Sequence, residues 1–155
     1  MHPNVESVQP LLGTFTGEGR GEYPTISTFG YREEVTFTDV GKPFIHYVQK
    51  TFALDDGRPM HTETGYLRPG ADGHIEFTLA QPTGQTESLE GTFTVDNGVL
   101  TITLDGRTTN TSTAKTVDAT RRVYRLEGDS LHTSFDMAAV GRDLGRHLTS
   151  ELRRA

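Results

Sequence analysis

Apolar and polar residues alternate along this chain in short runs, a pattern typical of β-strands rather than of helices. In residues 31–38 the alternation puts four residues on one face of a strand: Tyr31, Glu33, Val35 and Phe37. Three further segments are rich in the aromatic and β-branched residues that strands favour, namely 44–52, 92–95 and 99–104. The pattern predicts an all-β protein.

Turn signals separate these runs. Five dipeptides supply residues that tolerate the positive φ of tight hairpin turns: Asp56-Gly57, Asp72-Gly73, Asn97-Gly98, Asp105-Gly106 and Gly128-Asp129. Strands joined this tightly run antiparallel, and a long series of them avoids open edges by closing into a barrel. We therefore expect one up-and-down barrel domain over residues 8–155, preceded by a flexible N-terminus at residues 1–7.

The C-terminal segment has two interpretations on pattern alone. Leu144, Leu148 and Leu152 recur at helical spacing, which favours an amphipathic helix. Residues 146–152 also fit a closing strand, with His147 and Thr149 on the face opposite Leu148.

Composition narrows the function classes. The 155 residues suffice for one domain, and 15 Lys+Arg against 21 Asp+Glu give a net charge of −6, which disfavours a nucleic-acid partner. The absence of Cys excludes disulfides, thiolate catalysis and cysteine-based zinc sites. No apolar run is long enough to span a membrane and the N-terminus lacks the features of a signal peptide, so we expect a soluble, cytoplasmic protein with no membrane partner.

The interior of a small barrel is the default place for a ligand site. Six polar residues within the expected strands are candidates for such a site, although each taken singly is more often turned to water: His46, Gln49, His61, Glu63, Thr78 and Gln81. His61 and Glu63 share a strand face and could bind zinc together with His46, but a further ligand at defined spacing is missing.

Two further patterns carry little weight as catalytic motifs. The glycine-rich run 17–21 lacks the spacing of a phosphate loop and is followed by strand rather than helix signals. Glu33 and Glu34 point to opposite faces of a strand, so they do not form a carboxylate pair, and a solvated Glu is the ordinary interpretation.

Six His without Cys leave an imidazole as the best ligand for a transition metal or haem iron. His147 has suggestive flanks, because it lies between Leu144 and Leu148 and could emerge from an apolar wall. By composition alone, a surface histidine is the more common interpretation.

Several ordered motifs resemble the nitrobindin family, over about residues 11–154. They are Gly13-Thr14-Phe15-Thr16-Gly17-Glu18-Gly19, Glu22-Tyr23-Pro24-Thr25-Ile26, Phe29-x-Tyr31-x-Glu33-Glu34, Val40-Gly41-Lys42-Pro43-Phe44, Met60-His61-x-Glu63-x-Gly65-Tyr66-Leu67-Arg68, Thr113-Ala114-Lys115 and Met137-Ala138-Ala139-Val140-Gly141 followed by His147-Leu148. One position departs from the family, because Phe15 stands where relatives usually have Trp; a large ring is kept, and we expect the barrel to tolerate it.

The resemblance implies a ten-stranded antiparallel up-and-down β-barrel, similar to fatty-acid-binding proteins and lipocalins, holding one ferric b-type haem per chain. It implies His147 as the axial iron ligand and catalytic residue, which places His147 on a closing strand, and Lys115 and Thr25 as further haem contacts. It also implies that the protein is a peroxynitrite isomerase that forms nitrate and can bind nitric oxide.

Two functions from other classes remain open at this point. The barrel architecture also suits a carrier of a fatty acid or another small apolar ligand, although such carriers usually hold a carboxylate with buried Arg, and Arg121-Arg122 lies beside a turn-rich stretch. A nitric oxide sensor is the other alternative, but no partner motif is visible. A homodimer also stays open.

Overall fold

The structure is a computed structural model that describes residues 1–23, 26–139 and 141–155. Two short helices, α1 (Pro3–Glu6) and the 3₁₀ helix η1 (Gln9–Leu11), precede the strands. The strands are β1 (Gly13–Tyr23), β2 (Ile26–Lys42), β3 (Phe44–Ala53), β4 (Pro59–Pro69), β5 (His74–Ala80), β6 (Gln85–Asp96), β7 (Val99–Asn110), β8 (Val117–Glu127), β9 (Ser130–Ala139) and β10 (Gly145–Arg154). Within this described part of the chain, no helix has the length and apolar character needed to cross a membrane.

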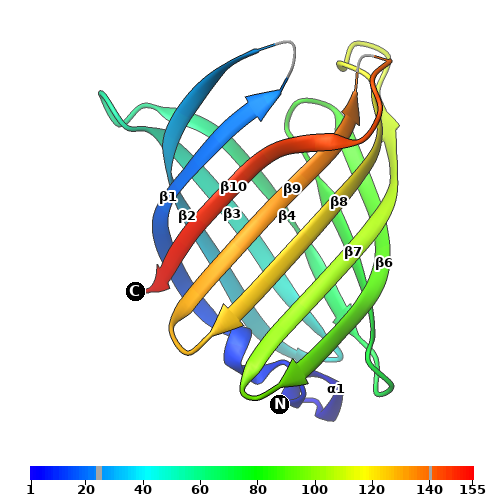
Figure 1. Ribbon diagram of the computed structural model, residues 1–155. Coiled ribbons are helices and arrows are strands. Elements are labelled where there is room, and N and C mark those ends of the chain that lie inside the picture. The colour runs from blue at the N-terminus through cyan, green and yellow to red at the C-terminus, as the bar shows by residue number, and fades with distance from the viewer. Residues whose placement is uncertain (24–25, 140) are drawn as a thin grey trace.

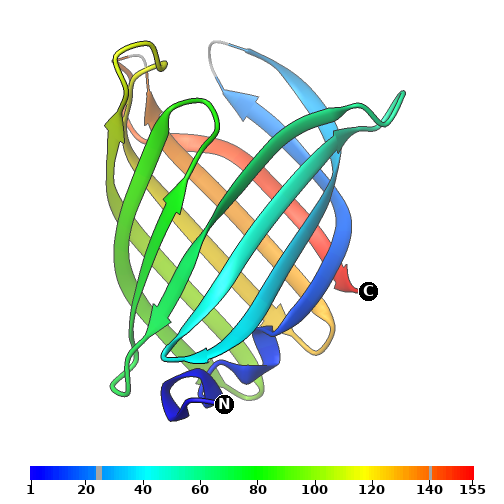
Figure 2. The ribbon, with the colours of Figure 1, turned by 180° about the vertical axis from the view of Figure 1, so that it is seen from behind.

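The ten strands form one closed antiparallel barrel, which confirms the predicted fold class (Figures 1 and 2). Each strand pairs with its sequence neighbours, and β1 closes the barrel against β10. The C-terminal segment is therefore a strand, because β1 offers it a full row of backbone partners from Phe15 to Gly21. The Asp105-Gly106 pair, expected in a turn, instead lies in the middle of β7.

The N-terminal helices cover one end of the barrel, at the bottom of Figure 1. The sequence suggests loose residues before Val8, whereas the structure has α1 there, with Val5 fully buried in the same core cluster as Val8 and Leu11. Burial of these side chains explains the order of the segment, since removing apolar surface from water stabilises it.

The barrel interior is layered along its axis. Near the helix-covered end the inward side chains are apolar and closely packed, and Phe15, fully buried, contacts Phe37 edge to face with 6.3 Å between ring centroids. Toward the other end the same inward rows become polar, for example from Phe37 and Val35 to Glu33 along β2. The polar half of the interior, away from the N-terminal helices, is therefore where a ligand site is expected.

The glycines of β1 explain part of the glycine-rich motif. A Cβ atom on Gly19 would lie 2.4 Å from the ring of Tyr31, and one on Gly21 would lie 2.2 Å from the ring of Phe29. Both rings come from β2 and need the surface that side chains at these positions would occupy. These glycines of the motif therefore leave room for two aromatic side chains to pack against β1, which accounts for them without a phosphate-binding role.

Candidate functional site

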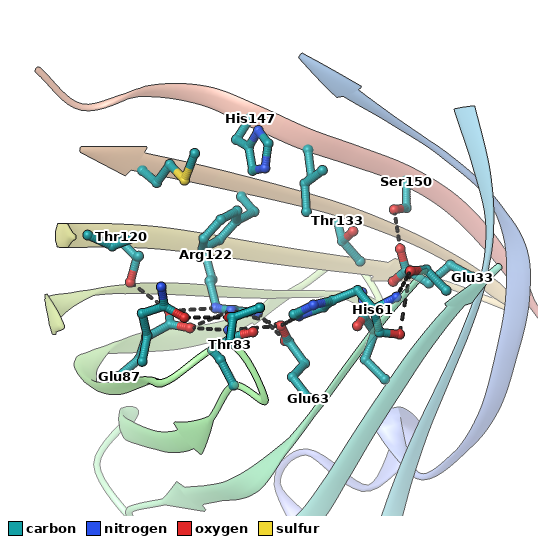
Figure 3. Close-up of a pocket in the computed structure, with 18 of the residues that line it drawn as sticks. Glu33, His61, Glu63, Thr83, Glu87, Thr120, Arg122, Thr133, His147 and Ser150 are labelled. Atoms are coloured by element: carbon teal, nitrogen blue, oxygen red, sulfur yellow. Dashed lines mark hydrogen bonds and ion pairs between the residues drawn. The ribbon is translucent and has the colours of Figure 1, made fainter. Parts of the chain in front are cut away.

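A cavity of about 360 Å³ occupies the interior of the barrel away from the N-terminal helices (Figure 3). This volume is within the range of small-molecule sites. Part of its wall is apolar: Phe29, Met60, Val117, Phe135, Met137 and Leu148. The remaining lining is polar and includes two histidines, His61 and His147.

His147 faces this cavity because β10 contains an irregularity at that residue. In the pairing with β9, Arg146 lies opposite Asp136 and Leu148 lies opposite Phe135, so His147 is an extra residue between them. A bulge of this kind interrupts the strict alternation of side chains. His147 and Leu148 consequently both line the cavity, whereas a regular strand would turn them to opposite faces.

The hydrogen bond of the His147 ring fixes its tautomer. Nδ1 lies 3.1 Å from the main-chain carbonyl oxygen of Glu22, which can only accept, so Nδ1 carries the hydrogen. Burial lowers the pKa of His147, outweighing this hydrogen bond, which raises it. The ring is therefore neutral near pH 7 and its lone pair is on Nε2, the form in which imidazole binds a metal.

Of the two other residues expected at the haem, Lys115 and Thr25, the structure describes only Lys115. Lys115, in the loop between β7 and β8, lies at the wall of the same cavity as His147, and its own carbonyl accepts a hydrogen bond of 2.8 Å from Nε2 of Gln85. Thr25 lies outside the described residues.

A buried charge cluster forms the polar side of the cavity. The Arg122 guanidinium donates to Glu63 Oε2 at 2.6 Å and to Glu87 Oε2 at 2.7 Å, and all three residues are at most 5% exposed. Gln81 Nε2 donates to both carboxylates, at 3.0 and 2.7 Å. Burial alone would raise the pKa of Glu63, but Arg122 and His61 together hold it well below the ordinary value. The cluster is thus an ionised network (Figure 3).

A second buried carboxyl group lies beside it. Burial raises the pKa of Glu33 to about 7, although Ser150 donates a hydrogen bond to its Oε1 at 2.5 Å. Ser150 also lies 3.3 Å from the hydroxyl of Tyr31. Gln49 Oε1 is one of two buried side-chain oxygens without a hydrogen-bond partner in the described part of the chain, so this side of the cavity can accept a water molecule or a ligand donor.

The predicted inward residues separate into two groups. Gln49, His61, Glu63 and Gln81 line the cavity. His46 Nε2 instead lies 3.0 Å from Thr64 Oγ1, and its ring contacts that of the exposed Tyr66; Thr78 is also exposed. The suggested zinc site is therefore wrong, because strand alternation puts His46 on the outer face, away from His61 and Glu63.

The sequence reasoning missed the importance of Arg122 and of Glu33. Arg121 lies on the outer face near Asp105, whereas Arg122 is buried inside the barrel. Alternation along β8 could have revealed this, since Arg122 shares its face with the apolar Tyr124 and Leu126. Glu33 is 4% exposed rather than solvated, consistent with its place between Tyr31 and Val35 on the apolar face of β2.

Comparisons with known proteins agree with this geometry. The family model described as "THAP4-like, heme-binding beta-barrel domain" matches residues 4–154. The chain is 48% identical to a protein of Nocardia farcinica named peroxynitrite isomerase, over 99% of this chain and 92% of that protein, and 48% identical to peroxynitrite isomerase 2 of Mycobacterium avium, over 99% and 96%. The crystal structure of Rv2717c from M. tuberculosis superposes with a TM-score of 0.97 at 45% identity, covering 100% of this chain and 99% of that one. The chain therefore belongs to the family of THAP4-like haem-binding β-barrel domains.

Proposed function

We propose that this protein binds one b-type haem per chain through Nε2 of His147 and isomerises peroxynitrite to nitrate at the ferric iron. The observation that carries the proposal is the neutral His147 ring, turned into the barrel cavity by the β10 bulge and held by the Glu22 carbonyl. The relatives named peroxynitrite isomerase at 48% identity support the reaction.

The residues of the cavity fit a haem. A neutral imidazole whose Nδ1 hydrogen is fixed by a carbonyl oxygen is a suitable iron ligand, because the hydrogen bond orients the ring and increases its basicity. The aromatic, aliphatic and thioether side chains of Phe135, Leu148 and Met137 provide an apolar surface beside it. The ring of Phe135 contacts that of His147, with 6.0 Å between centroids, and restricts its orientation.

The chain contributes binding, orientation and shielding from water. Bound haem supplies a Lewis-acidic ferric iron for the conversion of the anionic peroxide to nitrate. His147 would hold the iron, and the apolar side chains beside it would limit the access of bulk water. Lys115, exposed at the cavity rim, would hold a haem propionate by charge. Thr25 is proposed as a further haem contact on the family resemblance alone.

A haem titration tests this function. The protein with haem added should show a Soret band and should raise the yield of nitrate from peroxynitrite. His147→Ala should lose both, with an unchanged far-ultraviolet circular dichroism spectrum. His132→Ala is the matched control, because His132 lies on the outer face of the neighbouring strand β9. An unchanged Soret band and nitrate yield in His147→Ala would show that the ligand assignment is wrong.

Binding of nitric oxide to the haem that His147 would hold is also part of the proposal, on the family resemblance. Carriage of a fatty acid is disfavoured by the structure, because the buried Arg122 that could bind a carboxylate already holds Glu63 and Glu87. The cytoplasmic location and a homodimer stay predictions.

A further inference from the structure

A second imidazole lines the same cavity as that of His147. His61 belongs to the inward row of β4, one pleat from Glu63, and its side chain remains 31% exposed. Figure 3 shows the His61 ring beside Glu63 and the Arg122 cluster, with His147 on the far wall. The proposed haem function leaves His61 without a role.

Glu63 orients the His61 ring. His61 Nε2 lies 3.3 Å from Glu63 Oε1, while Tyr47 donates a hydrogen bond of 2.8 Å to Glu63 Oε2. Arg122 binds the same carboxylate through two nitrogens. Since Glu63 is fixed from two other sides, His61 has a rigid partner.

The charge balance of the cluster calls for a further cation. Glu63 and Glu87 share one guanidinium, that of Arg122, so two buried negative charges face one positive charge. Gln81 donates to both carboxylates but carries no charge. Protonated His61 brings the sum to zero, and it does so on the side that opens into the cavity.

The remaining titratable groups around the cavity do not supply this charge. Burial raises the pKa of Glu33 to about 7, and this group can only gain negative charge as pH rises; burial lowers the pKa of His147, which favours its neutral form, and Lys115 is exposed at the rim. Burial also lowers the pKa of His61, but its hydrogen bond and attraction to Glu63 outweigh burial and raise it. Tyr31, Tyr47 and Tyr124 are buried phenols whose pKa burial raises, so they stay neutral.

We propose that protonated His61, held by Glu63, is the group that attracts a small anion to the cavity and so determines its preference for anionic over neutral ligands. This inference rests on the proposed haem function, in which peroxynitrite is such an anion. In this arrangement His61 contacts the ligand, and Glu63 is a positioning residue.

Azide binding to the ferric haem-loaded protein tests the inference by a spectral shift that requires no turnover. In the wild-type protein the azide affinity should be highest while His61 is protonated and should fall as pH rises through its pKa, by roughly the factor that His61→Gln loses at low pH. In His61→Gln the affinity at low pH should fall by roughly tenfold or more, since a hydrogen bond to a charged group has an effect of that order, and this pH dependence should be lost. Binding of neutral carbon monoxide to the reduced protein should be unchanged.

Two controls separate the possible outcomes. His74→Gln removes an imidazole from the outer face of β5 and should behave as the wild type. Absence of a Soret band in the wild-type protein would contradict the haem function itself. A Soret band with the wild-type azide affinity and pH profile in His61→Gln would overturn the role of His61 alone.

Glu63→Gln provides an independent measurement if His61→Gln does not take up haem. This variant keeps the imidazole but removes the carboxylate that raises its pKa, so the midpoint of the azide profile should move to lower pH. An unmoved midpoint would overturn the inference.

Discussion

The guanidinium of Arg122 lies over the ring of Phe135, with 4.6 Å from its central carbon to the ring centroid. Phe135 in turn contacts the His147 ring. A cation–π contact therefore joins the buried charge cluster to the wall that carries the proposed iron ligand.

Replacing Arg122 tests how far stability depends on this cluster. Arg122→Met should lower the free energy of unfolding by roughly 3–5 kcal/mol, because it removes the guanidinium that binds both buried carboxylates, Glu63 and Glu87. Urea unfolding followed by circular dichroism measures the loss. Arg125→Met, on the exposed face of the same strand, should change stability by less than about 0.5 kcal/mol. Equal effects of the two substitutions would contradict the structural role of the cluster.

Glu33 should make stability depend on pH in the opposite direction from most carboxylates. Its pKa is raised from 4.5 to about 7 by burial, so the folded state binds a proton more tightly than the unfolded state. The free energy of unfolding should therefore decrease as pH rises between about 4.5 and 7, by on the order of 3 kcal/mol from this group.

Glu33→Gln isolates this contribution. The variant keeps a hydrogen-bond acceptor for Ser150 but does not titrate, so its stability relative to the wild type should increase with pH across that interval. Urea unfolding of both proteins at several pH values gives the difference. A difference that does not vary with pH would show that Glu33 titrates normally.

Replacing Gly19 of β1 by alanine should destabilise the barrel. Gly19→Ala places a Cβ atom 2.4 Å from the Tyr31 ring, which is packed and 2% exposed, so we expect a loss of roughly 1–3 kcal/mol. Gly30→Ala, on the paired strand, meets only the end of the exposed Leu54 side chain and should cost less. Thermal unfolding compares the two. The reverse order would mean that Tyr31 moves aside easily.

A long-chain fatty acid should not displace haem from this cavity. Its carboxylate would have to compete with Glu63 and Glu87 for Arg122 and would be repelled by both. The Soret band of the haem-loaded protein, followed while oleate is added, checks this expectation. Stoichiometric release of haem by oleate would support the carrier function instead.

Local sequence pattern predicts most strands because each inward row is specified by residues two apart. Tyr31, Glu33, Val35 and Phe37 share one face in the structure as the alternation indicates. The Asp105-Gly106 pair wrongly predicts a turn, because the glycine is needed for a contact with a neighbouring strand. A Cβ on Gly106 would lie 2.1 Å from the carbonyl oxygen of Ser88, so this glycine permits close strand packing rather than a turn.

The contacts of the candidate site are harder to predict from local sequence pattern. Arg122 and Glu63 are 59 positions apart and meet only across the barrel. The position of the Glu22 carbonyl next to His147, 125 positions away, likewise depends on closure of β1 against β10.

The sequence by itself determined that the chain forms antiparallel strands and, through its ordered motifs, which family it belongs to, because both depend on residue identity along one dimension. Only the tertiary structure decided that His147 faces the interior, since its direction depends on one unpaired residue in the register between β10 and β9. For Arg122 the alternation along β8 indicates the inward face, but only closure of the barrel brings in the carboxylates of Glu63 and Glu87 that keep it buried there.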